Sequence, residues 1–366
     1  MADEPVLRLE DIEVHFENRA GLLDFGAEDQ TVRAVDGVSF DLEERDVISL
    51  VGESGCGKTT LGKTAIGLQR PTGGSIKFRG HDIWDVRDGE SDADITWDEI
   101  RTSLQIIHQD PGSSLNPNRK IEAILRVPIN QTNPELSPGE KRERIYALLE
   151  RVGMTPAPDF ADRYPHQLSG GEKQRVALSR ALLMNPDVIL ADEAISALDV
   201  SLRVEMMDLM LELQDEFNTS YIFISHDLSN ARYFTAHGGG NIGVMYLGEL
   251  AEFGEAERMI GDPSHPYTKV LRWATPDLSL RDSGDLPMRK IDIPDPINPP
   301  SGCRFHTRCP EAREVCEEQR PEDFGEGDHQ VACFRAEDGH EYWDSPELSD
   351  ADADDLLGAD DSLQAD

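Results

Sequence analysis

A short glycine-rich segment of the chain has the residue types and spacing that bind phosphate groups. Gly52-Glu-Ser-Gly-Cys-Gly-Lys58-Thr59 fits the pattern G-x-x-x-x-G-K-[ST]. In this pattern the glycines let backbone N–H groups surround phosphate oxygens, the lysine reaches the β- and γ-phosphates, and the threonine hydroxyl ligates Mg²⁺. The apolar run Val47–Val51 precedes the segment and a helical stretch follows it, as the pattern requires. The segment therefore predicts a nucleoside triphosphate site, in which Cys56 is interpreted as a small loop residue rather than a ligand or nucleophile.

Two adjacent carboxylates at the end of another apolar run would complete such a site. The run Val188-Ile-Leu-Ala leads directly into Asp192 and Glu193. In proteins with a phosphate loop, the first carboxylate holds Mg²⁺, usually through water, and the second can polarise the attacking water. Strands often end in acidic residues, so the pair is informative because we expect it at the carboxyl edge of the same sheet as the loop. We therefore expect Asp192 at Mg²⁺ and Glu193 as the catalytic base.

Four apolar runs are expected to form the sheet that positions these residues. They are VISLV (Val47–Val51), LQII (Leu104–Ile107), VILA (188–191) and YIFIS (221–225). Runs this apolar are typical of strands buried on both faces, as in a parallel sheet. Residues 141–152 and 172–183 have apolar residues at helical spacing. This alternation of strands and helices indicates an α/β domain that ends near Met259.

A serine and two glycines before the second helix form another candidate anion site. In Leu168-Ser-Gly-Gly-Glu-Lys-Gln-Arg175, Ser169 can cap the helix and the glycines expose backbone N–H groups. The segment precedes the strand that ends at Asp192 by about twenty residues. With this combination the chain resembles the ATP-binding subunits of ABC transporters. In that family the phosphate loop, called Walker A, faces the LSGGQ signature of a partner subunit, and ATP is clamped between them.

Further motifs of that family follow in the family's order. Gln109 in IIHQDP matches the Q-loop glutamine, which senses Mg²⁺ and the γ-phosphate and touches the membrane partner. Ser196-Ala-Leu-Asp199 matches the D-loop, and His226 in FISHDL matches the switch histidine, within reach of the γ-phosphate. Phe16 is the best candidate for stacking on adenine; the insertion at residues 17–30 blurs this alignment, and a simple core position is the alternative.

The resemblance implies a role for each matching residue. The catalytic residues would be Glu193, His226, Gln109 and Lys58. The ligands of Mg²⁺ would be Thr59, Gln109 and Asp192. The residues that contact ATP would be Gly52, Glu53, Ser54, Gly55, Cys56, Gly57, Lys58, Thr59, Thr60, Phe16, Ser169, Gly170, Gly171, Glu172 and Asp199.

Three positions depart from the family pattern. Glu172 replaces the usual glutamine of the signature, Ala194 replaces a proline, and His108 replaces an aromatic residue. Glu172 puts a carboxylate near the nucleotide, where repulsion could weaken closure of the subunit pair, less so at high salt. No catalytic group is lost, so we expect competent ATP hydrolysis.

Four longer segments narrow the resemblance to the oligopeptide/dipeptide/nickel importer ATPases. They are GLQRPTGGSIKFRG, QDPGSSLNP, HPYT and INPPSGCRFHTRCP, and the resemblance covers residues 7–334. The RPTGG and QDPGSSLNP forms look more like the second of the two ATPases in such systems. The implied partners are a paired ATPase subunit in a heterodimer, two membrane permease subunits and an external solute-binding protein. The implied cargo is peptides, with oligosaccharides or nickel as alternatives.

Four of the five cysteines lie close together near the carboxyl end, with the spacing C-x5-C-x6-C-x16-C. No C-x-x-C pair is present, so a zinc ribbon fits poorly. In a reducing compartment such cysteines favour metal over disulfides, and thiolates hold Zn²⁺ or iron–sulfur clusters. Some members of the family have a four-iron, four-sulfur cluster here, which implies the ligands Cys303, Cys309, Cys316 and Cys333. Zinc, with His306 and His329 as rival ligands, is an alternative, as are disulfides or free thiols.

Composition limits the functions that the chain can have. Its 366 residues include 72 acidic and 35 basic ones, a net charge of −37. Nucleic-acid binding is disfavoured because phosphates need a basic face. Such a surface stays soluble at high ionic strength, which indicates a salt-adapted protein from a halophilic archaeon; an ordinary acidic protein with an acidic tail is the alternative. A non-transport ABC ATPase of DNA repair or translation, or a regulatory ATPase, is the competing function.

The sequence therefore predicts an α/β fold of the ABC-type P-loop NTPase class, with a RecA-like core sheet, a helical subdomain and a small cysteine-containing C-terminal domain. The expected boundaries are 1–260 for the ATPase domain, about 112–185 for the helical subdomain, 261–343 for the C-terminal domain and 344–366 for an acidic disordered tail. The start MADEPVLRLE lacks the features of a signal peptide, and no run of about 18 apolar residues occurs. We expect a peripheral protein at the cytoplasmic face of the membrane.

Overall fold

A seven-stranded sheet forms the centre of the computed structural model, which describes residues 4–18, 30–275, 288–289, 293–325 and 329–348. In spatial order its strands are β11 (Gln330–Val331), β10 (Glu249–Glu255), β9 (Gly240–Tyr246), β3 (Val47–Val51), β8 (Ser220–Ile224), β7 (Val188–Asp192) and β6 (Leu104–Ile107). The pairs from β9 to β6 are parallel, whereas β10 and β11 are antiparallel additions. The parallel arrangement brings the carboxyl ends of β3, β8, β7 and β6 to one edge.

The α/β class predicted from the four apolar runs is confirmed, because each run lies in a strand of this sheet. The bounds differ slightly, since β7 extends to Asp192 and β8 covers residues 220–224. These strands are apolar at every position because both faces are covered. Tyr221 and Phe223 pack into one core, and Ile222 and Ile224 pack into another on the opposite face.

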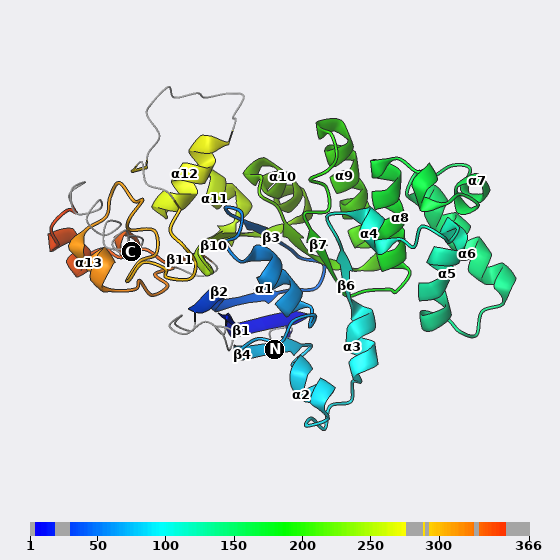
Figure 1. The fold of residues 1–366 in the computed structure, drawn as a ribbon, viewed down its shortest axis with the longest axis horizontal. Helices are drawn as coiled ribbons and strands as arrows, with labels where there is room; N and C mark the ends of the chain where they lie inside the picture. Colours follow the sequence, from blue (N-terminus) through cyan, green and yellow to red (C-terminus); the bar gives the residue numbers. More distant parts are fainter. Residues whose placement is uncertain (1–3, 19–29, 276–287, 290–292, 326–328, 349–366) are drawn as a thin grey trace, which may run out of the picture.

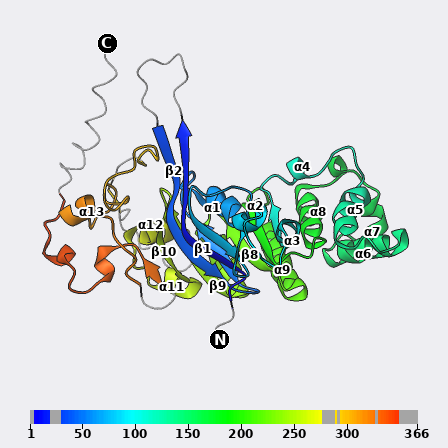
Figure 2. The ribbon, with the colours of Figure 1, turned by 90° about the horizontal axis from the view of Figure 1, so that it is seen from below.

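One face of the main sheet is covered by a helix and a second, antiparallel sheet. The helix is α1 (Lys58–Ala65), and the second sheet has the order β2 (Gln30–Leu42), β1 (Leu7–Asn18), β4 (Gly73–Phe78) and β5 (His81–Asp82). Figure 2 shows β1 and β2 side by side as a long ribbon. Short helices α2 (Ile83–Asp88) and α3 (Trp97–Ser103) lead back to β6. Leu61 of α1 packs with Leu9 of β1 and Leu50 of β3 in one core, which fixes α1 directly after the strand that precedes it.

Helices α9 (Val200–Phe217) and α10 (Leu228–Gly238) cover the opposite face. Met206 and Met210 of α9 pack in the same core as Tyr221 of β8 and Phe234 of α10. The Tyr221 and Phe223 rings contact the Phe234 ring at 5.6 and 4.6 Å between centroids. The sheet is therefore a buried middle layer, as its sequence predicts.

A group of helices lies at one end of the molecule, beyond β6 (Figure 1). It consists of α4 (Pro111–Ser114), α5 (Ile121–Thr132), α6 (Pro138–Arg151), α7 (Ala157–Ala161), the 3-10 turn η1 (Pro165–Gln167) and α8 (Gly170–Leu182). The two helices predicted at 141–152 and 172–183 begin earlier than expected. Their caps explain this, because Ser137 with Glu140 and Ser169 with Glu172 each form a capping box one turn further back.

The C-terminal segment (the described residues after 261) lies at the other end of the molecule and packs on the main sheet (Figure 1). Its elements, with the preceding α11 (Ala256–Gly261), are α12 (Pro266–Ala274), α13 (Glu314–Glu318), β11, and the 3-10 turns η2 (Phe334–Ala336) and η3 (Glu341–Asp344). Val331 of β11 pairs with Glu252 of β10, and Phe305 shares a core with Val244 of β9. Of the tail expected at 344–366, Ser345, Pro346 and Leu348 make backbone hydrogen bonds, with the Glu314 N–H donating to the carbonyl of Pro346; residues 349–366 lie outside the described residues.

Candidate functional site

The glycine-rich loop lies between β3 and α1 in a conformation that requires glycine at two positions. We call residues 52–60 the Walker A loop. Gly57 has a φ of 108° and Gly52 a φ of 149°. A Cβ on Gly57 would lie 2.1 Å from the carbonyl oxygen of Ala34, and a Cβ on Gly52 would lie 2.2 Å from that of Met245. The close approach of these backbones therefore holds the loop in place at both ends.

Lys58 is buried and directs its ammonium group into the loop. Its Nζ donates to the carbonyl oxygens of Gly52 at 2.8 Å and Glu53 at 2.9 Å, and lies 3.6 Å from the Sγ of Cys56. An ammonium held by two backbone carbonyls can exchange them for phosphate oxygens without changing its position much. Burial raises the pKa of the Cys56 thiol, which keeps it neutral beside the lysine.

The first turn of α1 meets the end of β7. The Oγ1 of Thr59 donates to the Oδ1 of Asp192 at 2.8 Å. A hydroxyl and a carboxylate in contact are the oxygen donors that Mg²⁺ prefers, so this pair fits the ion chemically. The strand order β3-β8-β7 produces the contact, because β3, which leads to Thr59, and β7, which leads to Asp192, end at the same edge of the sheet.

Two polar side chains from different elements, those of His226 and Gln109, meet at the carboxylate of Glu193. Its Oε2 lies 3.1 Å from the Nδ1 of His226 and 3.4 Å from the Nε2 of Gln109, which is also 3.4 Å from the Oγ of Ser196. Glu193 has a φ of 48°, and its N–H donates to the carbonyl of Ile224 at 3.1 Å. This left-handed conformation turns the chain sharply after β7. The arrangement can accept a proton from water at the carboxylate.

A cleft of about 490 Å³ joins Lys58, the Thr59–Asp192 pair, Gln109 and Glu193, whereas His226 does not line it. Its expected lining residues are Ser54, Gly55, Gly57, Lys58, Thr59, Thr60, Gln109, Asp192 and Glu193. It is also lined by four residues that were not assigned to the site, namely Ala34, Lys63, His108 and Asp110. Helical spacing could have identified Lys63, which lies one turn after Thr59 and Thr60. Burial lowers the pKa of His108, which favours a neutral ring in the cleft.

The signature and D-loop residues lie outside this cleft. Ser169, Gly170, Gly171 and Glu172 begin α8, where the Oγ of Ser169 accepts from the N–H of Glu172 at 3.3 Å. In return the carboxylate of Glu172 accepts from the N–H of Ser169 at 2.6 Å. Asp199 caps α9 by accepting from the N–H of Leu202 at 3.1 Å. One chain therefore does not bring its own signature to its own Walker A loop.

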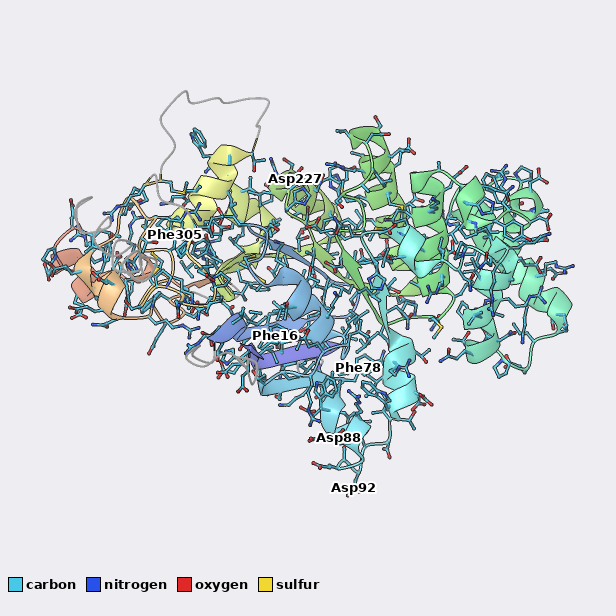
Figure 3. All side chains as sticks on the ribbon, in the orientation of Figure 1. Phe16, Phe78, Asp88, Asp92, Asp227 and Phe305 are labelled. Carbon is cyan, nitrogen blue, oxygen red and sulfur yellow. The ribbon has the colours of Figure 1, made fainter. Side chains whose placement is uncertain are left out.

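Phe16 lies near the end of β1, opposite Val32 of β2 (Figure 3). Its side chain is 46% exposed, so the alternative that it is a core residue is wrong. Residues 19–29 of the expected insertion lie outside the described residues. An accessible ring is available at this position.

The four C-terminal cysteines meet around one small cavity. Cys303, Cys309, Cys316 and Cys333 all line it as free thiols. Burial raises the pKa of Cys309 to about 12 and of Cys333 to about 11, so without a cation both are neutral. In the parts of the chain that the structure describes, no group of three or more His, Cys, Asp and Glu side chains is placed to hold a metal ion.

The two histidines named as rival zinc ligands differ in their contacts. The Nε2 of His329 lies 2.9 Å from the carboxylate of Glu252, so this nitrogen already has a partner. His306 lines the cysteine cavity, and its Nδ1 lies 2.8 Å from the carbonyl of Cys303. Its Nε2 is buried without a hydrogen-bond partner among the described residues. Of the two, His306 has a nitrogen that is open to a further contact.

Two protein families match separate parts of the chain. Residues 35–196 match the ABC transporter family. Residues 251–316 match the family described as oligopeptide/dipeptide transporter, C-terminal region. The first match includes the Walker A loop, Asp192 and Glu193; the second includes three of the four cysteines and ends at Cys316.

Curated relatives match most of the chain. The oligopeptide transport ATP-binding protein AppF of Bacillus subtilis is 44% identical over 90% of this chain and 97% of its own. The dipeptide transport ATP-binding protein DppF of Haemophilus influenzae is 42% identical over 90% of this chain and 96% of its own.

Solved structures of ATP-binding cassettes share the fold. The cbiO1 protein of Clostridium perfringens, part of the ABC transporter complex cbiONQ, has a TM-score of 0.57 and 25% identity, and the match covers 71% of this chain and 92% of that chain. The ATP-binding cassette MJ0796, in a dimeric post-hydrolysis state bound to ADP and Pi, has a TM-score of 0.57 and 26% identity, over 68% of this chain and 98% of that chain. Within the described residues, no helix combines the length and apolar character needed to cross a membrane.

Proposed function

Because the chain belongs to the ABC transporter ATPases of the oligopeptide/dipeptide importer family, we propose that it binds MgATP at the Walker A loop and hydrolyses it to drive peptide import through a membrane permease. One observation carries the hydrolytic part of this proposal. The Glu193 carboxylate lies in contact with His226 and Gln109, in the cleft that also contains Lys58 and the Thr59–Asp192 pair. The residues that we propose as base, phosphate-binding lysine and magnesium ligands therefore line one cleft.

Each of these side chains would contribute a separate part of the reaction. The Walker A backbone and Lys58 would bind the β- and γ-phosphates, and Thr59, Asp192 and Gln109 would hold Mg²⁺. Mg²⁺ would neutralise charge on the phosphate oxygens. Glu193 would accept the proton of the attacking water, and His226 would orient the carboxylate and reach the γ-phosphate.

The active unit in this proposal is a pair of ATPase subunits. The Walker A cleft lacks a signature segment of its own, and the N–H groups at the start of α8 are not covered at Gly170, where a Cβ would meet no atom within 4 Å. We propose that the Ser169–Glu172 segment and Asp199 contact the ATP of a paired subunit, in a heterodimer where this chain is the second ATPase. Phe16 would stack on the adenine of the ATP bound by its own chain.

The remaining partners follow from the transport role. They are two membrane permease subunits and an external solute-binding protein, with the ATPase pair at the cytoplasmic face of the membrane. Oligosaccharides or nickel are the alternative cargo. Uptake competition in cells with and without this subunit tests the cargo, because only the uptake that depends on the subunit reports on it; labelled peptide is competed by peptides, sugars or Ni²⁺. Competition by sugar or Ni²⁺ instead of peptide would overturn the peptide assignment.

The four cysteines would hold a four-iron, four-sulfur cluster or, alternatively, zinc. Support comes from the meeting of four thiols at one cavity in a segment with little apolar core of its own. Such a group would stabilise the fold of residues 303–333. Anaerobic purification followed by iron, sulfide and zinc analysis tests this. A colourless protein free of iron and zinc would overturn it.

The charge of −37 supports a halophilic, archaeal origin and a salt-dependent fold. We propose that the ATPase domain covers residues 1–260, the C-terminal domain residues 261–343 and the acidic tail residues 344–366. Folding that is unaffected when the salt concentration falls from molar to millimolar would contradict salt adaptation.

An ATPase assay on the purified chain and its partner, with and without Mg²⁺, tests the catalytic role directly.

A further inference from the structure

Glu53, the residue after the first glycine of the Walker A loop, is held from three directions. Its carboxylate accepts hydrogen bonds from both terminal nitrogens of Arg308, at 2.8 and 2.9 Å. Its N–H donates to the hydroxyl of Tyr267 at 3.0 Å. Its carbonyl oxygen accepts from the Nζ of Lys58 at 2.9 Å. One residue of the loop therefore connects the C-terminal segment to the phosphate-binding lysine.

Arg308 is itself fixed by its surroundings. Its side chain is 5% exposed, and its Cζ lies 5.6 Å from the Tyr246 ring centroid and 5.9 Å from that of Phe305. Burial opposes its charge, but the hydrogen bonds to Glu53 and Tyr246 raise the pKa of Arg308 above its ordinary value. Because Arg308 is buried, salt screens this bidentate ion pair with Glu53 much less than it screens a pair on the surface.

Tyr267 and its neighbours form a rigid aromatic support for this arrangement. The ring centroids of Tyr246, Tyr267 and Phe305 lie 4.7, 5.2 and 5.3 Å apart in the three pairs. Figure 3 marks Phe305 within the C-terminal segment. Tyr267 is fully buried at the start of α12, where His265 accepts its N–H at 3.0 Å. Both groups that hold Glu53 from the C-terminal side therefore have fixed positions.

We propose that the C-terminal segment positions the Walker A loop through Glu53, with Arg308 and Tyr267 as positioning residues for ATP. The inference rests on the proposed function of this loop as the ATP site. Fixing Glu53 fixes one of the two carbonyls on Lys58, so the ammonium is already placed for the phosphates. The guanidinium also neutralises the Glu53 carboxylate, which would otherwise be an unpaired negative charge on the Walker A loop, next in sequence to Ser54 of the cleft.

Affinity for MgATP is the direct measure of this role. Arg308→Gln in the full chain should raise the Kd of MgATP on the order of tenfold in titration calorimetry at constant molar salt, because it frees the Glu53 charge. Arg308→Lys should bind MgATP more tightly than Arg308→Gln but less tightly than wild type, because an ammonium keeps the charge but cannot form the bidentate contact. Tyr267→Phe keeps the ring and removes the acceptor for the Glu53 N–H, so a rise of about threefold is expected.

Arg313→Gln is the matched control for a purely structural effect. Arg313 lies in the same segment and donates to the carbonyls of Tyr342, Trp343 and Ser345 rather than to the loop. It should lower the Tm while leaving the Kd of MgATP within about twofold of wild type. A Kd that rises equally in Arg313→Gln and Arg308→Gln would overturn the proposal, because loss of fold alone would then explain both.

A double-mutant cycle tests whether Arg308 acts through Glu53. If it does, Glu53→Gln combined with Arg308→Gln should bind MgATP more tightly than Arg308→Gln alone, because the double variant no longer carries the Glu53 charge that Arg308→Gln frees. Losses that multiply, or an Arg308→Gln variant with wild-type Kd, would contradict the inference. A wild-type protein that does not bind MgATP would instead refute the proposed function of the loop.

Discussion

The hydroxyl of Thr59 donates a 2.8 Å hydrogen bond to the carboxylate of Asp192, which lies 133 residues further along the chain. The contact joins the first turn of α1 to the end of β7. The strand that precedes α1 is β3, and β8 lies between β3 and β7 in the sheet. It places a hydroxyl and a carboxylate where they can share one cation.

Asp192→Asn should therefore raise the Mg²⁺ concentration needed for half-maximal ATPase activity. The amide keeps an oxygen for the Thr59 hydroxyl but removes the negative charge that attracts the ion. We expect a shift on the order of tenfold, measured as ATPase rate against free Mg²⁺ at saturating ATP. Exposed Asp159→Asn in α7 is the control. An unchanged Mg²⁺ requirement would remove Asp192 from the cation site.

Glu193→Gln should lower kcat by on the order of 10²–10⁴ while MgATP binding is retained. The amide is nearly the same size as the carboxylate but cannot accept the proton of the attacking water. Single-turnover hydrolysis with labelled ATP measures the effect, and exposed Glu143→Gln in α6 should leave the rate unchanged. Near-normal turnover would show that another group is the base.

Gly57→Ala should destabilise the protein by about 2 kcal/mol or more. The residue has a φ of 108°, and its new Cβ would lie 2.1 Å from the Ala34 carbonyl oxygen. Chemical denaturation measures the loss. Gly139→Ala in α6 is the control, because a Cβ there meets only the Ser137 Oγ, at 3.9 Å, and alanine favours a helix. Equal stabilities for the two variants would be incompatible with the described loop.

Glu172→Gln should leave stability within about 0.5 kcal/mol of wild type, because glutamine also completes a capping box with Ser169. The substitution removes a negative charge from the surface that we propose contacts the partner subunit's ATP. ATPase activity of the assembled pair should rise at low salt, and the difference should shrink as salt increases. Identical rates at every salt concentration would show that this charge does not oppose closure.

Asp46→Asn should stabilise the protein at neutral pH and lose that advantage in acid. Burial raises the pKa of Asp46, so the folded state binds its proton more tightly than the unfolded state does. The stability contribution of Asp46 is therefore present below the ordinary pKa and is lost as the pH rises through the raised one. Asparagine does not titrate and keeps an acceptor for the Val47 N–H. A difference in unfolding free energy that is constant from acid to neutral pH would contradict this.

Local patterns in the sequence were sufficient to place the strands and the glycine-rich loop. Strands buried on both faces must be apolar at every position, so VISLV, LQII, VILA and YIFIS could be recognised without knowing their neighbours. The helix starts were less accurate, because Ser137 and Ser169 lie outside the apolar periodicity and act through hydrogen bonds to Glu140 and Glu172.

The contacts between distant residues were decided by the tertiary structure alone. Strand order brings Glu193 to His226 and Gln109, and packing of the C-terminal segment on the sheet brings Arg308 to Glu53, 255 residues away. A sequence encodes local propensity and the buried side of each element. Which side chains meet at the edge of the sheet depends instead on the spatial order of the strands. The residue types that handle ATP could thus be read from the chain, whereas the support of the Walker A loop by the cysteine-containing segment could not.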